Sequence, residues 1–188
     1  MTVYIALLRG INVGGNNKIK MADLRKACEA IGLRRVQTYI QSGNVLFETE
    51  EAAEEVLRSR LEQMIEEKFG IKLYVVLRTA DELRQIAAGF PYSEEAIGEA
   101  DAASDAVSEY VAMLLEAPGP EQDAALSPYS NEAEQYRIIG REIYLLVHQS
   151  IADSKLATQL MKLKVPATVR NRNTMNKLVA LANAMEEA

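Results

Sequence analysis

The sequence predicts an α+β protein built from two duplicated split βαβ halves, each a ferredoxin-like plait with an antiparallel sheet, and an extra C-terminal helix. Three observations lead to this prediction. Short apolar runs typical of strands alternate with segments whose apolar residues have helical spacing. The resulting element order β-α-β-β-α-β occurs twice, and an acidic stretch separates the two occurrences.

The first half is expected at residues 1–88. Leu24, Ala27 and Cys28 begin an apolar set with helical spacing, whereas the strands are recognised as short apolar runs. A tight turn at Ser42-Gly43-Asn44 predicts a hairpin, because Gly and Asn tolerate the positive φ that such turns demand. The expected elements are strands at residues 2–9, 35–40, 44–48 and 71–77 and helices at residues 21–31, 50–68 and 80–88.

The second half is expected at residues 107–188, after an acidic linker at residues 89–106. The linker contains five acidic residues, no basic residue and Pro91. A second hairpin should turn at Gly140-Arg141, and either Asn173 or Thr174 should cap the C-terminal helix. The expected elements are strands at residues 109–115, 136–139, 143–148 and 167–169 and helices at residues 120–126 and 154–163.

The net charge of −6 argues against indiscriminate nucleic-acid binding, but the charges are unevenly distributed. Residues 1–47 hold seven basic and two acidic side chains, and residues 137–188 hold eight basic and four acidic ones. The middle of the chain, residues 48–136, holds six basic and 21 acidic side chains. If the two basic ends meet, they form a positive face. Solvated acidic helices in the middle of the chain explain the same count without such a face.

The single cysteine and the absence of export signals predict a cytoplasmic protein. Cys28 has no partner for an internal disulfide, which is common in a reducing compartment. The first residues lack the pattern of a signal peptide, and no run of 18 apolar residues occurs. We therefore expect no membrane association.

The first polar cluster, residues 9–18, lies between the first strand and the first helix. Its glycines let backbone N–H groups approach a ligand, and a helix N-terminus favours negative charge. The cluster lacks the GK[ST] of a P-loop and the GxGxxG of a dinucleotide site. It predicts either a phosphate or carboxylate site or a loop that needs positive φ and Asn turns. The candidate ligand-binding residues are Arg9, Asn12, Gly14, Gly15 and Lys18.

The second polar cluster, residues 39–44, lies at the first hairpin turn. Turn chemistry alone explains its Ser-Gly-Asn sequence but does not explain Gln41. Gln41 and Asn44 are therefore further candidates for ligand binding.

The third polar cluster, residues 170–174, directly precedes the last helix. Two guanidinium groups near the positive end of a helix are unfavourable unless an anion, an acidic side chain or water lies nearby. The cluster predicts either an anion site or an ion pair with the acidic middle of the chain. Its candidate residues are Arg170, Asn171 and Arg172.

The sequence offers few other candidates for catalytic or metal-binding residues. His148 ends an apolar run, and Cys28 lies on the apolar face of its helix, so both are expected to be structural. One histidine and one cysteine make no zinc constellation, and we expect neither a metal nor a cofactor.

The three clusters together resemble a family of bacterial proteins of unknown function. Members of this family open with a version of ALLRGINVGG, continue with a version of YIQSGNV and end with a version of ATTRNWNT; here these stretches are ALLRGINVGGNNKIKM, TYIQSGNVLF and ATVRNRNT. The resemblance implies a plait-like α+β fold of two related halves, and it implies no activity. The sequence departs from the family pattern at Val169, where threonine is usual, and at Arg172, where an aromatic residue is usual.

Three hypotheses of function follow. The first is a module that binds an anionic ligand, such as a nucleotide or the phosphates of a nucleic acid, through the three clusters at the ends of secondary-structure elements. The second is an enzyme of unknown reaction that works by Arg and Asn electrostatics. The third is a structural or interaction protein in which the motifs bind no ligand.

Overall fold

The computed structural model describes residues 1–188, which form two compact units. Unit 1 consists of Met1–Gln85 and Lys177–Ala188, and unit 2 consists of Ile86–Asn176. Each unit contains one four-stranded antiparallel sheet. The predicted α+β class with two duplicated halves is therefore confirmed.

Unit 1 contains the first βαββαβ set. Its sheet has the strand order β2-β3-β1-β4, in which every neighbouring pair is antiparallel. Its elements are β1 (Thr2–Leu8), α1 (Met21–Ala30), β2 (Arg34–Tyr39), β3 (Asn44–Thr49), α2 (Glu54–Phe69), β4 (Val75–Thr79) and α3 (Ala80–Ala88, of which Ile86 onward belongs to unit 2).

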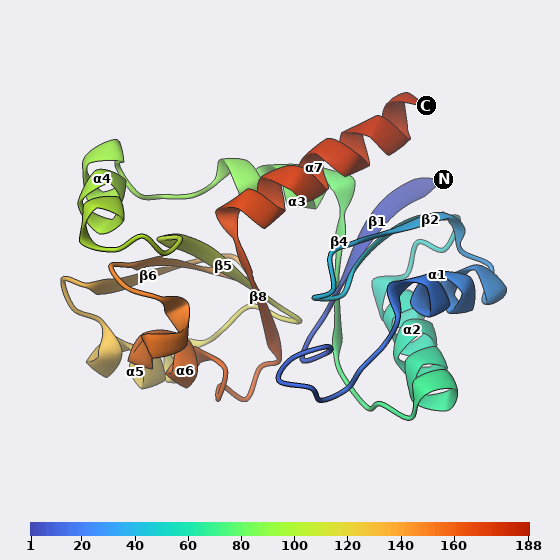
Figure 1. Ribbon diagram of the computed structural model, residues 1–188, viewed down its shortest axis with the longest axis horizontal. Helices are drawn as coiled ribbons and strands as arrows, with labels where there is room; N and C mark the ends of the chain where they lie inside the picture. Colours follow the sequence, from blue (N-terminus) through green and yellow to red (C-terminus); the bar gives the residue numbers. More distant parts are fainter. The chain divides into compact units, whose positions relative to one another are not determined.

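The core of unit 1 lies between the sheet and helices α1 and α2, which cover one of its faces (Figure 1). Leu24 of α1, Leu57 of α2 and Phe47 of β3 are all fully buried in this core. Burying a side chain of this size stabilises a fold by about 1.5–3 kcal/mol. The helical spacing of the apolar residues thus orients both helices on the sheet.

Unit 2 repeats the same arrangement. Its sheet has the order β6-β7-β5-β8, which is the order of unit 1 with each strand number raised by four. Its elements are α4 (Glu94–Ala103), β5 (Glu109–Leu114), α5 (Pro120–Leu126), β6 (Glu134–Ile139), β7 (Glu142–Val147), α6 (Lys155–Leu160), β8 (Ala167–Asn171) and α7 (Arg172–Glu187, of which Lys177 onward belongs to unit 1).

Strand register reveals the duplication at the level of single residues. Tyr4 pairs with Thr79 in unit 1, and Tyr110 pairs with Asn171 in unit 2. Aligning these pairs matches the sequence YIALL of β1 with YVAML of β5, and the buried Arg78 of β4 with Arg170 of β8. Element order alone supported the repeat in the sequence, because the identities become visible only in register.

Both strands that carry a buried arginine differ from their predicted bounds. The apolar runs predict strand ends at residues 77 and 169, but β4 continues through Arg78 and Thr79 and β8 continues through Arg170 and Asn171. Arg78 donates from Nη1 to the carbonyl of Leu77 at 2.8 Å. A prediction from hydropathy ends a strand at an arginine, because arginine is usually exposed. Arg78 and Arg170 are instead buried within their strands, where their guanidinium groups donate hydrogen bonds to backbone carbonyls.

Residues 89–106, expected to be an acidic linker, contain helix α4. Ser93 caps this helix, because its Oγ accepts a hydrogen bond from the N–H of Ala96 at 3.1 Å. The division of the chain into halves at residues 1–88 and 107–188 stays a prediction.

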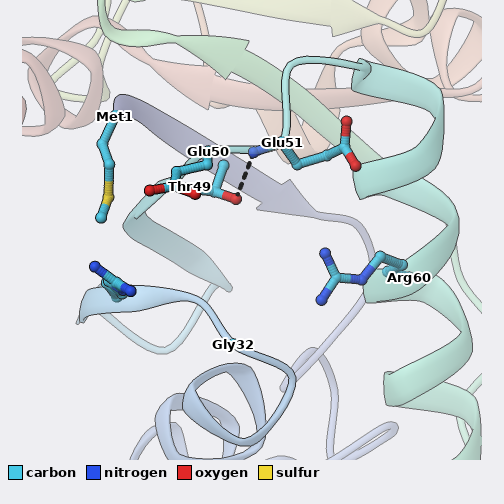
Figure 2. A pocket seen from close by; sticks show the side chains of 7 residues that line it. Met1, Gly32, Thr49, Glu50, Glu51 and Arg60 are labelled. Carbon is cyan, nitrogen blue, oxygen red and sulfur yellow. Dashed lines mark hydrogen bonds between the residues drawn. The ribbon is translucent and has the colours of Figure 1, made fainter.

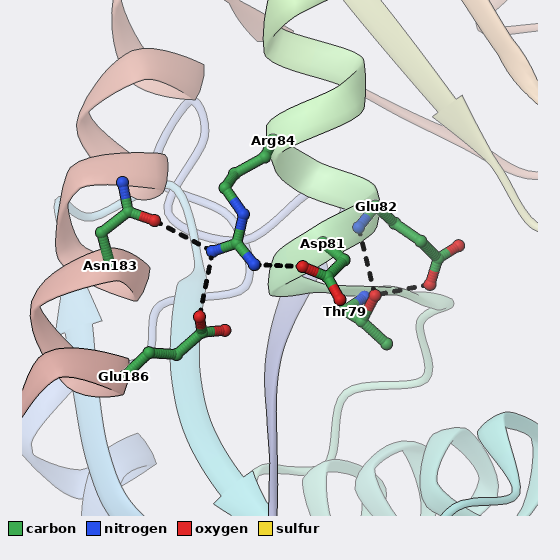
Figure 3. A network of polar contacts seen from close by, with 6 residues as sticks. All are labelled: Thr79, Asp81, Glu82, Arg84, Asn183 and Glu186. Carbon is green, nitrogen blue, oxygen red and sulfur yellow. Dashed lines mark hydrogen bonds and ion pairs between the residues drawn. The ribbon is translucent and has the colours of Figure 1, made fainter.

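The end of α7 is held in unit 1 by polar contacts. Arg84 of α3 donates from Nη1 to Asn183 at 2.9 Å and to Glu186 at 3.2 Å, and it pairs with Asp81 through Nη2 (Figure 3). The carboxylates of Asp81 and Glu186 are exposed, so each ion pair contributes little to stability. None of the helices combines the length and the apolar character needed to span a bilayer.

Candidate functional site

The side chain of Asn12 organises the loop between β1 and α1. Its Nδ2 donates to the carbonyls of Ile19 at 3.0 Å and Gln41 at 2.8 Å, and its Oδ1 accepts from the N–H of Ile19 at 2.9 Å. Asn12 itself has a φ of 54°, which asparagine tolerates better than most residues. The first polar cluster is thereby cross-linked to the second, and the amide of Asn12 is occupied by this task.

The hairpin turn packs closely against the same loop. Tyr39 pairs with Asn44, so the turn comprises residues 40–43. Asn44 is the first residue of β3, as the strand predicted at residues 44–48 implies, although the predicted turn Ser42-Gly43-Asn44 had also included it. Gly43 has a φ of 86°, and a Cβ atom there would lie 2.7 Å from Cδ1 of Ile11. Asn44 is fully buried and donates from Nδ2 to the carbonyl of Tyr39 at 3.0 Å.

The two clusters line a pocket of about 820 Å³ in unit 1. Four of the predicted site residues contribute to its lining: Asn12, Gly15, Lys18 and Gln41. Gly14, the partly buried Arg9 and the fully buried Asn44 lie outside the lining. The structure therefore brings the first two motifs together around one pocket, whereas the side chain of Asn44 bonds to Tyr39 across the hairpin turn.

The first turn of α1 forms one wall of this pocket. The N-cap residue, Lys20, makes no side-chain capping bond. The N–H groups of Met21 and Ala22 have no hydrogen-bond partner in the chain, and both residues line the pocket beside Lys18 and Lys20. Unpaired amides at a helix N-terminus carry partial positive charge and attract anions. Asp23, in the same turn, partly offsets this charge.

The corresponding helix of unit 2, α5, begins differently, because Pro120 at its first position has no N–H group. Gly119 is the N-cap of α5, and its N–H donates to the side-chain oxygen of Gln122 at 2.6 Å. The connection from β5 to α5 is only residues 115–119, whereas the connection from β1 to α1 is residues 9–20. The two units thus differ at this element: unit 2 has a short connection to a helix that begins with proline, and unit 1 has a long connection to a helix start beside two lysines.

The third cluster belongs to unit 2, where Arg170 and Asn171 have structural partners. Arg170 donates from Nη1 to Oγ1 of Thr168 at 2.7 Å and to the carbonyl of Val169 at 3.0 Å. Burial lowers the pKa of its guanidinium to about 10. The cap of α7 is Asn171, whose Oδ1 accepts from the N–H of Thr174 at 2.8 Å, and not Asn173 or Thr174 as expected.

Arg172 forms the ion pair that was the alternative to an anion site. Its Nη1 lies 2.8 and 2.9 Å from the two carboxylate oxygens of Glu109, a residue of the acidic middle of the chain. Its guanidinium carbon lies 5.0 Å from the centroid of the Phe90 ring. The planar guanidinium therefore pairs with a carboxylate and also packs over an aromatic ring.

A second pocket, of about 400 Å³, has lining residues of both charges (Figure 2). Arg60 donates to the carbonyl of Ile31 at the end of α1. Glu51 accepts at 2.9 Å from the N–H of Ala53, which precedes α2, and its own N–H donates to Oγ1 of Thr49 at 3.1 Å. These groups complete the ends of helices, so the larger pocket is the better candidate for a ligand.

Cys28 is buried in the core of unit 1, as predicted, and burial raises the pKa of its thiol to about 12. We expect the folded protein at pH 8 to react with a thiol reagent such as dithionitrobenzoate at least a hundredfold more slowly than the unfolded protein, because the thiolate is scarce and inaccessible. Stopped-flow absorbance with and without guanidinium chloride measures the ratio, and equal rates would place the thiol at the surface.

Sequence reasoning missed part of this pocket wall. Met21 and Ala22 were assigned only to the start of a helix, and Lys20 and Phe69 lay just outside the predicted helices at residues 21–31 and 50–68. One signal was available: no Ser, Thr, Asp or Asn stands at the N-cap of α1, which a helix start without an external partner usually has.

Comparisons with known proteins give a family and a fold. A family described as proteins of unknown function (DUF1697) matches residues 1–144. Among solved structures, the chain is similar to that of the conserved bacterial protein SP0830 from Streptococcus pneumoniae, with a TM-score of 0.72 and 26% sequence identity over 96% of this chain and 98% of that one. No curated protein matches the chain.

Proposed function

Because the chain belongs to the DUF1697 family of proteins of unknown function, we propose a function from its geometry: unit 1 binds a phosphate-bearing or otherwise anionic ligand at the start of α1. One observation carries the proposal. The unpaired N–H groups of Met21 and Ala22 share a pocket with Lys18 and Lys20. Backbone donors and cations that converge in one hollow suit a phosphate or carboxylate group.

The remaining motif residues have supporting roles in this proposal. Asn12 holds the long loop in place, and Gly15 and Gln41 complete the pocket rim. The proposal rests on unit 1 alone, since Arg170, Asn171 and Arg172 are engaged within unit 2. A cytoplasmic location, expected from the single cysteine, is part of the same proposal.

Titration of the isotopically labelled protein with inorganic phosphate and pyrophosphate, followed by amide NMR, tests the proposal. We expect the largest shifts at Met21 and Ala22, and at least tenfold weaker binding after the double change Lys18→Ala and Lys20→Ala. Asp23→Asn should instead strengthen binding about two- to fivefold, because a negative charge near the anion is removed. Affinities should fall as salt is added.

The matched control is the double change Lys162→Ala and Lys164→Ala, which removes the same charge from exposed positions in unit 2. Its affinity should equal that of the unchanged protein. If both double variants weaken binding equally, only the net charge matters and the pocket is not the site. Anions that leave the amides of Met21 and Ala22 unshifted would also refute the proposal.

A further inference from the structure

The pocket in unit 1 has two unlike walls. Lys18, Lys20 and the free amides of α1 form the cationic wall. Ile19, Met21 and Phe69 add apolar surface to the same hollow. A bare phosphate ion would occupy only the cationic wall and leave the apolar surface in water, so a ligand that fits both walls carries an apolar group as well as an anion.

Phe69 is the aromatic residue of this apolar wall. It is the last residue of α2, partly buried and packed against the core of unit 1. The chain has three phenylalanines; Phe47 stacks with Tyr4 and Phe90 packs edge-on against Tyr144, whereas Phe69 takes part in no ring pair. Its ring therefore has no aromatic neighbour within the protein, and its side chain lines the pocket.

Gln41 provides a polar group at the rim. Its backbone carbonyl accepts from Asn12, which fixes its position, while its side-chain amide makes no hydrogen bond in the chain. A free amide offers both a donor and an acceptor, as the edge of a nucleobase requires. The volume of about 820 Å³ is in the range of pockets that hold molecules of drug size and is larger than phosphate needs.

We propose that the ligand of this pocket is a mononucleotide, with its phosphate at Lys18, Lys20 and the start of α1 and its base against the ring of Phe69. This inference rests on the proposed function and adds the class of ligand. Two lysines beside one aspartate can pair with the phosphate of a mononucleotide but provide too few cations to follow the backbone of a duplex. Stacking on one ring also tolerates different bases, so purine and pyrimidine nucleotides should both bind.

The test compares inorganic phosphate, ribose 5-phosphate and AMP by amide NMR titration of the same protein. We expect AMP to bind at least tenfold more tightly than ribose 5-phosphate, and Phe69→Leu to weaken AMP binding about tenfold without changing the affinity for phosphate. Tyr74→Leu is the matched control, because Tyr74 is an exposed aromatic residue outside this pocket, and it should change neither affinity.

The outcomes separate the two proposals. Equal affinities for AMP and ribose 5-phosphate, or a Phe69→Leu variant with unchanged AMP affinity, would overturn the nucleotide inference and leave phosphate binding intact. Failure of all three compounds to shift Met21 and Ala22 would overturn both. If Phe69→Leu lowers the melting temperature, Phe69→Met supplies a second ring-free variant with comparable apolar bulk.

Discussion

Replacement of Gly43 by alanine should lower the free energy of unfolding by about 3 kcal/mol. The left-handed φ of 86° costs an L residue about 1–2 kcal/mol, and overpacking costs about 1–3 kcal/mol more. The new Cβ would lie 2.7 Å from Cδ1 of Ile11 and 2.9 Å from Cβ of Leu8, neither of which can move without disturbing the core. Urea unfolding measures the change, and thermal melting should show a decrease of about 6–12 °C.

Gly14→Ala is the control for the packing contribution. Gly14 also has a positive φ, 59°, but a Cβ atom at this position meets nothing within 4 Å. Its substitution should therefore cost only the backbone contribution, about 1 kcal/mol. Equal losses of stability at the two positions would show that the close contact between the hairpin turn and Ile11 does not restrict Gly43.

Replacement of Arg172 by alanine should lower the free energy of unfolding by about 2 kcal/mol. The change removes the ion pair with Glu109 and the contact with the ring of Phe90. Glu109 has a side chain only 8% exposed, so its carboxylate would stay in a largely dry site without its cation. Because the Arg172 side chain is itself 39% exposed, the loss should be below the 3–5 kcal/mol typical of fully buried pairs.

Arg84→Ala is the comparison for this prediction. Arg84 pairs with Asp81 and Glu186, whose side chains are 82% and 41% exposed, so its loss should cost at most about 1 kcal/mol. Adding Glu109→Gln to Arg172→Ala should recover part of the lost stability, because the second change removes the unpaired charge. A double variant less stable than Arg172→Ala would show that burial of the Glu109 charge is not the source of the loss.

The two units show how one fold can be specialised by a loop. Both follow a buried strand with a turn into a helix, but only unit 1 lengthens this connection and brings Lys18 and Lys20 to the helix start. The cross-links made by Asn12 keep the long loop ordered at this helix start. Ligand binding at α1 is therefore proposed for unit 1 and not for its repeat.

The order and type of the elements could be predicted from local sequence patterns. Apolar residues recur with helical spacing at Leu24 and Leu57, and they form short runs in β1 and β7. These patterns arise because each element buries apolar residues, so they can be recognised in the amino-acid sequence alone. The same patterns failed at Arg78 and Arg170, because hydropathy cannot tell that a buried arginine has found partners. They also failed at α4, whose acidic composition is typical of a loop.

The amino-acid sequence by itself determined the α+β class, the repeated βαββαβ order and the segments in which polar motifs interrupt the fold, because these follow from periodicity and turn chemistry within a few residues. Only the tertiary structure decided what each motif does. Asn12 and Gln41 are 29 positions apart, and Arg172 and Glu109 are 63 positions apart. Whether a guanidinium or an amide is used inside the protein or left for a ligand depends on such distant partners, which no local pattern specifies.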